Sequence, residues 1–89
     1  MMLEKEYMIK NKLGLHARAA AQFVKTANRF SCDVKVSKDR VVANGKSIMG
    51  VLTLAAAQGS TIKVMCEGHD AEDAQTSIGT LINAKFGEE

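Results

Sequence analysis

Alternating apolar and polar residues at the start of the chain predict a β-strand. Within residues 2–10, the odd positions Leu3, Tyr7 and Ile9 are apolar, and only Lys5 breaks the alternation. Because successive side chains of a strand point to opposite faces of a sheet, this pattern is typical of a strand with one buried face.

Two later segments carry the same alternation. In residues 32–45, CDVKVSKDRVVANG, apolar residues at 32, 34 and 36 alternate with polar ones, and the polar Lys38-Asp39 pair can turn the chain back into Val41 and Val42. We therefore expect a β-hairpin there. Residues 61–67 also alternate and predict the last strand, which Gly68 ends.

Other segments have the spacing of helices. In residues 17–27 the apolar positions recur at i, i+3, i+4 and i+7, as expected for a helix with one buried stripe. Ser47 is a favourable N-cap for a short apolar helix over residues 48–54.

The last helix is predicted from Asp70 onward, with this residue as its N-cap. Glu72 and Asp73 in its first turn match the positive end of the helix dipole. Lys85 suits its other end, and Gly87 can stop it.

The order of these elements indicates an α+β fold. A strand, a helix, two strands, a helix, a strand and a helix predict one antiparallel sheet covered on one face by helices. A chain of 89 residues has room for one two-layer core, so residues 1–89 are expected to form a single domain.

Composition and charge exclude several classes of protein. The chain is 46% hydrophobic and 25% charged, unlike a disordered segment. A net charge of +2, one Tyr and three Phe argue against an RNA-binding module or another nucleic-acid binder. The longest nearly apolar run, IMGVLTLAAA, is far below the roughly 20 residues of a membrane span. With no visible leader, we expect a cytoplasmic protein without membrane insertion.

The two cysteines are expected to be buried and inert. Cys32 and Cys66 form no CxxC pair and the sequence has no clustered histidines, which argues against a zinc site. A reactive thiol or a disulfide is the alternative, which a reducing cytosol disfavours. We expect neither a metal nor a cofactor.

The stretch GLHARAAAQF, residues 14–23, places His16 and Arg18 where a helix begins. Unpaired amides and the helix dipole favour a bound anion there, and Gly14 lets the loop approach closely. A guanidinium suits two phosphate oxygens, and imidazole can attack phosphorus near neutral pH. From the residues alone, a surface histidine beside a solvated arginine is an equal alternative. The other histidine, His69, has no nearby arginine and is expected to be solvated.

GLHAR at residues 14–18, together with NGKSIMGVLTLAA at residues 44–56, resembles the bacterial phosphotransferase system's histidine-containing phosphocarrier family, HPr. The resemblance implies an open-faced β-sandwich of four antiparallel strands under three helices. It also implies that His16 accepts a phosphoryl group on Nδ1 from the phosphoenolpyruvate-dependent general phosphotransferase enzyme. A sugar-specific or regulatory acceptor protein would receive it next, so the chain would be a stoichiometric carrier with little catalysis of its own.

The resemblance also assigns roles around His16. Arg18 becomes the phosphate-stabilising arginine, with the backbone amides of Ala17 and Arg18 as further contributors. The family usually has proline after the arginine, where this chain has Ala19. Because proline would stiffen the helix entry, transfer rates or partner choice are expected to differ. The alternative function is a regulatory HPr-like protein, for example of a nitrogen-linked branch.

Ser47 in NGKS is not a P-loop serine, because Arg40 stands where that motif needs glycine. A helix N-cap explains this serine structurally. By resemblance, it is also the residue that an HPr kinase/phosphorylase modifies in some bacteria, with an effect on partner docking more than on folding.

The short helix is too apolar to be fully buried in so small a protein, so part of it should form an exposed patch near the histidine. By resemblance, the partner-docking surface comprises Ala20, Lys25, Ile48, Met49 and Leu52. The basic residues at its rim suit partners with acidic surfaces. We expect the protein to work as a monomer.

Overall fold

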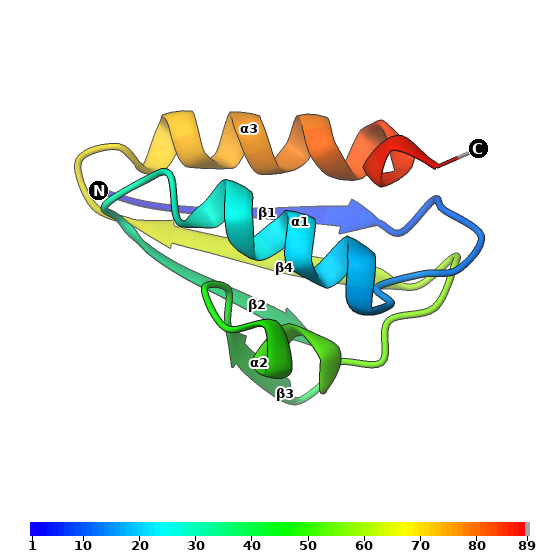
Figure 1. The fold of residues 1–89 in the computed structure, drawn as a ribbon. Helices are drawn as coiled ribbons and strands as arrows, with labels where there is room; N and C mark the ends of the chain where they lie inside the picture. The colour runs from blue at the N-terminus through cyan, green and yellow to red at the C-terminus, as the bar shows by residue number, and fades with distance from the viewer. Residues whose placement is uncertain (89) are drawn as a thin grey trace.

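A computed structural model describes residues 1–88 and confirms the predicted order of elements (Figure 1). The strands and helices are β1 (Met2–Met8), α1 (Ala17–Ala27), β2 (Asp33–Lys38), β3 (Val41–Asn44), α2 (Ile48–Leu52), β4 (Thr61–Glu67) and α3 (Ala71–Asn83), followed by a 3₁₀ turn, η1 (Lys85–Gly87).

The four strands form one antiparallel sheet in the order β1-β4-β2-β3. The register places Tyr7 opposite Ile62 and Val34 opposite Cys66, and all four side chains are buried. The alternation in the sequence therefore predicted the buried face of β1, β2 and β4, whereas on β3 Val41 and Val42 are exposed and Ala43 is buried.

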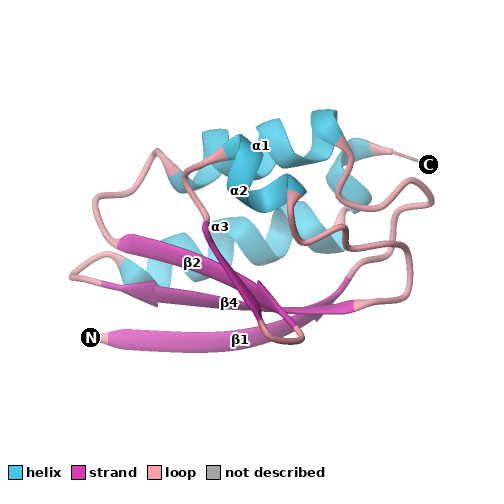
Figure 2. Ribbon diagram, turned by 90° about the horizontal axis from the view of Figure 1, so that it is seen from below, coloured by secondary structure: helices cyan, strands magenta, loops and turns pink. Residues whose placement is uncertain are grey.

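The helices lie in one layer on one face of the sheet, as the view in Figure 2 shows. The core between the layers takes alternate residues from the strands and one stripe from each long helix. On α1 the stripe includes Phe23 and Val24, and on α3 it includes Ile78 and Ile82. The opposite face of the sheet carries no helix of residues 1–88, in agreement with the predicted open-faced sandwich.

One buried polar side chain joins α3 to the sheet. Gln75 donates through Nε2 to the carbonyl oxygens of Leu3 at 3.1 Å and Val64 at 2.8 Å. The Tyr7 hydroxyl donates to Gln75 Oε1 at 2.9 Å. The buried amide therefore has partners for both its donor and its acceptor, which removes most of the cost of burying it.

Asp70 is at the N-cap position of α3, as predicted, but its side chain makes no capping hydrogen bond. Its carboxylate instead accepts hydrogen bonds from the backbone amides of Ser31 at 2.8 Å and Cys32 at 2.9 Å, in the turn before β2. These bonds, the one from Ser31 foremost, lower the pKa of Asp70 to about 2. The neighbouring His69 is exposed, as predicted.

The end of α3 also differs from the prediction. The helix ends at Asn83, and the next residues form a left-handed turn in which φ is +58° at Lys85, +55° at Phe86 and +78° at Gly87. Such a backbone costs a non-glycine residue roughly 1–3 kcal/mol. The Phe86 ring is buried in the core, and this burial offsets the cost. The turn directs Glu88 back toward α1.

Cys32 and Cys66 are free and buried, as predicted. Burial raises the pKa of the Cys66 thiol to about 12, so its reactive thiolate form is scarce at neutral pH. Within residues 1–88, no helix has the length and apolar character needed to cross a membrane.

Candidate functional site at the start of α1

His16 is the N-cap of α1. Its backbone is extended, with φ −74° and ψ 178°, and its Nδ1 accepts a hydrogen bond from the Arg18 amide at 3.3 Å. The His16 carbonyl accepts the first intrahelical bond, from the Ala20 amide at 2.8 Å. The ring therefore lies at the positive end of the helix dipole, as the sequence predicted.

Gly14 determines where the loop before His16 runs. The Leu15 amide donates to the Ala56 carbonyl at 2.9 Å, which draws the loop onto the segment after α2. Gly14 has φ +68°, and a Cβ at this position would lie only 2.4 Å from the Ala56 oxygen. Both the left-handed backbone and this close approach require glycine.

Glu88 is the residue of the site that the sequence did not reveal. Its Oε2 is hydrogen-bonded to His16 Nε2, and its Oε1 accepts from Asn11 Nδ2 at 3.2 Å. The hydrogen bond with His16 is the main reason that the pKa of Glu88 is lowered, with smaller contributions from Asn11 and from the charge of Arg18. The carboxylate is therefore ionised at neutral pH.

These contacts give the two ring nitrogens different roles. An ionised carboxylate can only accept, so Nε2 of His16 carries a hydrogen that it donates to Glu88. In the neutral ring, Nδ1 then holds the lone pair, which agrees with its accepting the Arg18 amide. That bond is long, and the His16 side chain is 27% exposed. In the neutral ring, Nδ1 is therefore the nitrogen that holds a lone pair.

Two hydrogen-bond donors from the residues that follow His16 are available to bind an anion. Arg18 is exposed, and its guanidinium forms no ion pair with any residue from 1 to 88. In the same part of the chain, the Ala17 amide has no hydrogen-bond acceptor. The structure thus brings together His16, Ala17 and Arg18 as predicted, and adds Glu88 on the far side of the ring.

Ser47 is the N-cap of α2, as predicted, because its Oγ accepts from the Gly50 amide at 3.1 Å. The next two residues form the exposed apolar patch that the sequence predicts: Ile48 is 42% and Met49 72% exposed. Leu52 is partly buried and packs against the core.

Ala20 does not belong to the surface, so the expectation that it helps to dock partners is wrong. It is fully buried because it lies on the same helical stripe as Phe23 and Val24. Lys25, on the other side of α1, is exposed.

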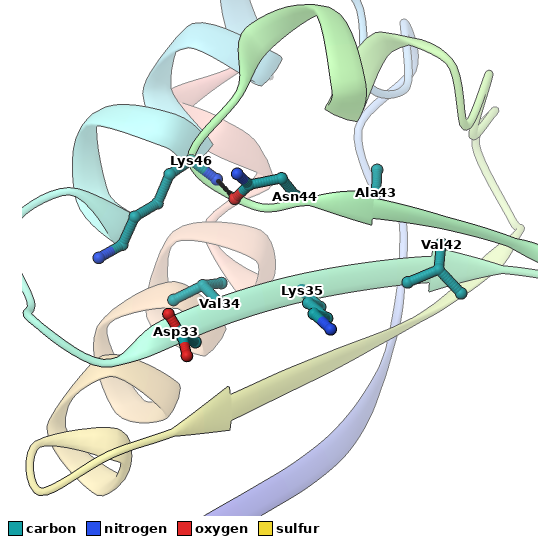
Figure 3. Close-up of a pocket in the computed structure, with 7 residues that line it drawn as sticks. All are labelled: Asp33, Val34, Lys35, Val42, Ala43, Asn44 and Lys46. Carbon is teal, nitrogen blue, oxygen red and sulfur yellow. Dashed lines mark hydrogen bonds between the residues drawn. The ribbon is translucent and has the colours of Figure 1, made fainter.

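A surface hollow of about 370 Å³ lies on β2 and β3, away from this site (Figure 3). Its lining residues are Asp33, Val34, Lys35, Val42, Ala43, Asn44 and Lys46. Lys46 donates through Nζ to the Phe30 carbonyl at 2.7 Å, and Figure 3 shows its side chain directed away from that of Lys35. The two ammonium groups therefore do not converge on an anion.

The family described as "PTS HPr component phosphorylation site" matches residues 3–84. The chain belongs to the HPr family. The matched residues include the histidine, the arginine and the serine that the sequence singled out, whereas Glu88 lies beyond them.

Relatives and solved structures of the HPr family match nearly the whole chain. The phosphocarrier protein HPr of Neisseria meningitidis is 47% identical over 87 residues, which is 98% of each chain. The HPr-like protein Crh of Halalkalibacterium halodurans is 46% identical over 81 residues, 91% of this chain and 96% of the relative.

A crystal structure of HPr from Thermoanaerobacter tengcongensis is 49% identical, covers 98% of both chains and has a TM-score of 0.94. Another structure from this organism, described as an HPr dimer, is 50% identical with a TM-score of 0.79 over 92% of this chain and 94% of the other. Like other members of the HPr family, the chain is a phosphocarrier of the phosphotransferase system.

Proposed function

We propose that Nδ1 of His16 is the atom that carries the phosphoryl group. The observation behind this proposal is the asymmetry of the ring: Nε2 is held by Glu88, while the Nδ1 lone pair faces the first amides of α1. Nδ1 is thus the nitrogen whose electron pair is engaged only by the long bond from the Arg18 amide, and it lies at the anion-binding start of the helix.

The transfer step needs no separate base. The Nδ1 lone pair forms a bond to phosphorus as the bond between phosphorus and the donor breaks, and the donor keeps that electron pair. The ring then carries a positive charge, which the Glu88 carboxylate stabilises through the hydrogen on Nε2. When the phosphoryl group moves on, the Nδ1–P electron pair returns to the ring, and a neutral imidazole leaves.

Arg18 and the free amide of Ala17 would hold the oxygens of the phosphoryl group. A charge-assisted arginine contact contributes about 1.5–3 kcal/mol, and a helix N-terminus about 0.3–2 kcal/mol. The Arg18 amide can shift from Nδ1 to a phosphoryl oxygen, because its present bond to the ring is long.

The donor in this proposal is the general phosphotransferase enzyme, and the recipient is a sugar-specific or regulatory acceptor protein in the cytoplasm. Docking would use Lys25, Ile48, Met49 and Leu52, since the first three are exposed and the last is partly so. A monomer satisfies this scheme, because one chain supplies the whole site.

Ser47 is proposed as a regulatory phosphorylation site for a kinase of the HPr kinase/phosphorylase type. It lies immediately before the exposed apolar patch of Ile48 and Met49. A phosphate there would place a charge beside the docking residues and weaken apolar contacts with a partner.

A regulatory role is the second candidate, and the similarity to the HPr-like protein Crh favours it. A carrier must hand its phosphoryl group on, whereas a regulator need only bind a target differently once it is modified. The asymmetric His16 ring favours the carrier, because a regulator has no need of a histidine that can release its phosphoryl group.

The test is to incubate the chain with phosphoenolpyruvate and the general phosphotransferase enzyme and to follow phosphorylation by mass spectrometry. We expect one acid-labile, base-stable phosphoryl group in the wild type and none in His16→Ala. His69→Ala is the matched control and should be phosphorylated like the wild type. Absence of label on the wild type would falsify the carrier role.

A further inference from the structure

Asn11 is a fully buried polar residue in the loop between β1 and α1. Its side-chain nitrogen Nδ2 donates to the Gly14 carbonyl at 2.7 Å and to Glu88 Oε1 at 3.2 Å. Its side-chain oxygen Oδ1 is also buried and has no hydrogen-bond partner among residues 1–88.

The two contacts determine which way the Asn11 amide points. Both neighbours, the Gly14 carbonyl and the Glu88 carboxylate, are acceptors. Turning the amide over would bring Oδ1 against both of these oxygens. The NH₂ group must therefore face them, and Oδ1 then has no hydrogen-bond partner among residues 1–88.

Folding alone does not explain an asparagine at this position. A buried acceptor without a partner destabilises the folded chain, and an apolar residue of similar size, such as leucine, carries no such group. One of its two hydrogen bonds holds the Gly14 carbonyl in the loop before His16, and the other reaches Glu88, the residue that holds the His16 ring.

We propose that Asn11 is a positioning residue for His16 and acts through Glu88. This inference rests on the proposed role of His16 in carrying the phosphoryl group. The two carboxylate oxygens of Glu88 have different partners: Oε1 accepts from Asn11 Nδ2, and Oε2 is hydrogen-bonded to His16 Nε2. Asn11 thereby fixes the rotation of the Glu88 carboxylate. In this orientation the carboxylate keeps the hydrogen of the His16 ring on Nε2 and the lone pair on Nδ1.

A double-mutant cycle separates this role from a purely structural one. Asn11→Leu should slow phosphoryl acceptance from the general phosphotransferase enzyme by about two- to tenfold, the size of one hydrogen bond. In a Glu88→Ala background the same substitution should change the rate no further. Asn44→Leu, which removes another turn amide, is the matched control and should leave the rate unchanged. Equal losses from Asn11→Leu in both backgrounds would overturn the proposal.

A second measurement needs no phosphoryl transfer. The pKa of Glu88, whose carboxylate is surrounded by His16, Arg18 and Asn11, can be followed through its ¹³C carboxyl resonance. Asn11→Leu should raise this pKa toward the ordinary value, and ¹⁵N shifts of the His16 ring should show less hydrogen on Nε2. An unchanged Glu88 pKa and ring spectrum would overturn the positioning role, whether or not His16 is the phosphorylated residue.

If Asn11→Leu does not fold, Glu88→Ala provides the same information with Asn11 intact. Removing the carboxylate should shift the side-chain NH₂ resonances of Asn11 and accelerate their exchange with water. Side-chain NH₂ signals identical to those of the wild type would show that Asn11 and Glu88 are not coupled, and the proposal would fail.

Discussion

The helices α1 and α2 begin in nearly the same way. Each has an N-cap, His16 or Ser47, whose side chain accepts a first-turn amide and which we propose to be a site of phosphorylation. In each case a glycine lies two residues earlier and is packed against a neighbouring segment. A Cβ on Gly14 would lie 2.4 Å from the Ala56 oxygen, and one on Gly45 would lie 2.5 Å from Val34 Cγ1.

The surroundings of the two caps differ. The Glu88 carboxylate binds the far side of the His16 ring, and Arg18 follows His16 by two residues at the start of an 11-residue helix. Ser47 begins a five-residue helix and is followed by the exposed apolar residues Ile48 and Met49. We therefore expect that a capped helix start only places the side chain, and that the charges around it determine how readily it accepts a phosphoryl group.

Gly14→Ala should have the largest effect, because it disrupts the support beneath the His16 cap. A left-handed alanine and its contact with the Ala56 carbonyl together should lower the free energy of unfolding by roughly 2–6 kcal/mol. Urea denaturation measures this loss. Phosphorylation of the remaining folded protein should also slow, because the loop must move away from Ala56.

Gly59→Ala is the matched control for that substitution. Gly59 is also left-handed, with φ +89°, but a Cβ there would meet nothing within 4 Å. It should show only the backbone cost, about 1 kcal/mol or somewhat more. Equal losses at Gly14 and Gly59 would mean that the contact with Ala56 contributes nothing.

Arg18→Ala should remove the cation that distinguishes the first cap from the second. The rate of phosphoryl acceptance should fall roughly 10- to 150-fold, which corresponds to losing one charge-assisted contact. Rapid-quench kinetics with the general phosphotransferase enzyme measure this rate. Arg40→Ala, at an exposed hairpin residue, controls for the loss of a positive charge. Matching rates in the two variants would remove Arg18 from the site.

Glu88→Gln should reduce the rate of phosphoryl acceptance by about two- to tenfold and change how stability depends on pH. In the folded protein, the pKa of Glu88 is lower than its ordinary value of 4.5, mainly because of the hydrogen bond with His16. The stability that its ionised form contributes is therefore complete above this ordinary value and disappears as the pH falls through the lowered one. The wild type should be more stable than Glu88→Gln at neutral pH, and the difference should vanish in acid. A difference in urea midpoint that stays constant with pH would contradict the hydrogen bond between the ionised Glu88 carboxylate and His16.

Local patterns explain why most of the fold was predictable. Strand alternation and helical stripes arise from residues close in sequence, and the buried set Ile62, Val64 and Cys66 follows directly from that spacing. His16 and Arg18 were found for the same reason, since they lie two residues apart. The stripe on α1 also predicted that Ala20 is buried, so this local pattern was a better guide than the docking role inferred from resemblance.

The errors concern contacts between residues far apart in sequence. Asp70 is a residue type that often caps a helix through its side chain. Its carboxylate binds the amides of Ser31 and Cys32, which the fold brings near, and not an amide of the first turn of α3. Glu88 reaches His16 across 72 positions, through a left-handed turn that buried Phe86 stabilises. The glycine before Glu88 was read only as the end of a helix, although it also permits this turn.

Ser47→Ala should have the smallest effect and completes the comparison of the two caps. Losing the bond from the Gly50 amide should lower the free energy of unfolding by about 1 kcal/mol, the usual contribution of a serine cap. The rate at which His16 accepts a phosphoryl group should not change, because Ser47 contacts neither the ring nor Glu88 within the described residues. Urea denaturation and rapid-quench kinetics on the same preparation test both parts. A slower reaction at His16 without loss of stability would show that the two helix starts are coupled, and the contrast between a reactive and a merely structural cap would no longer hold.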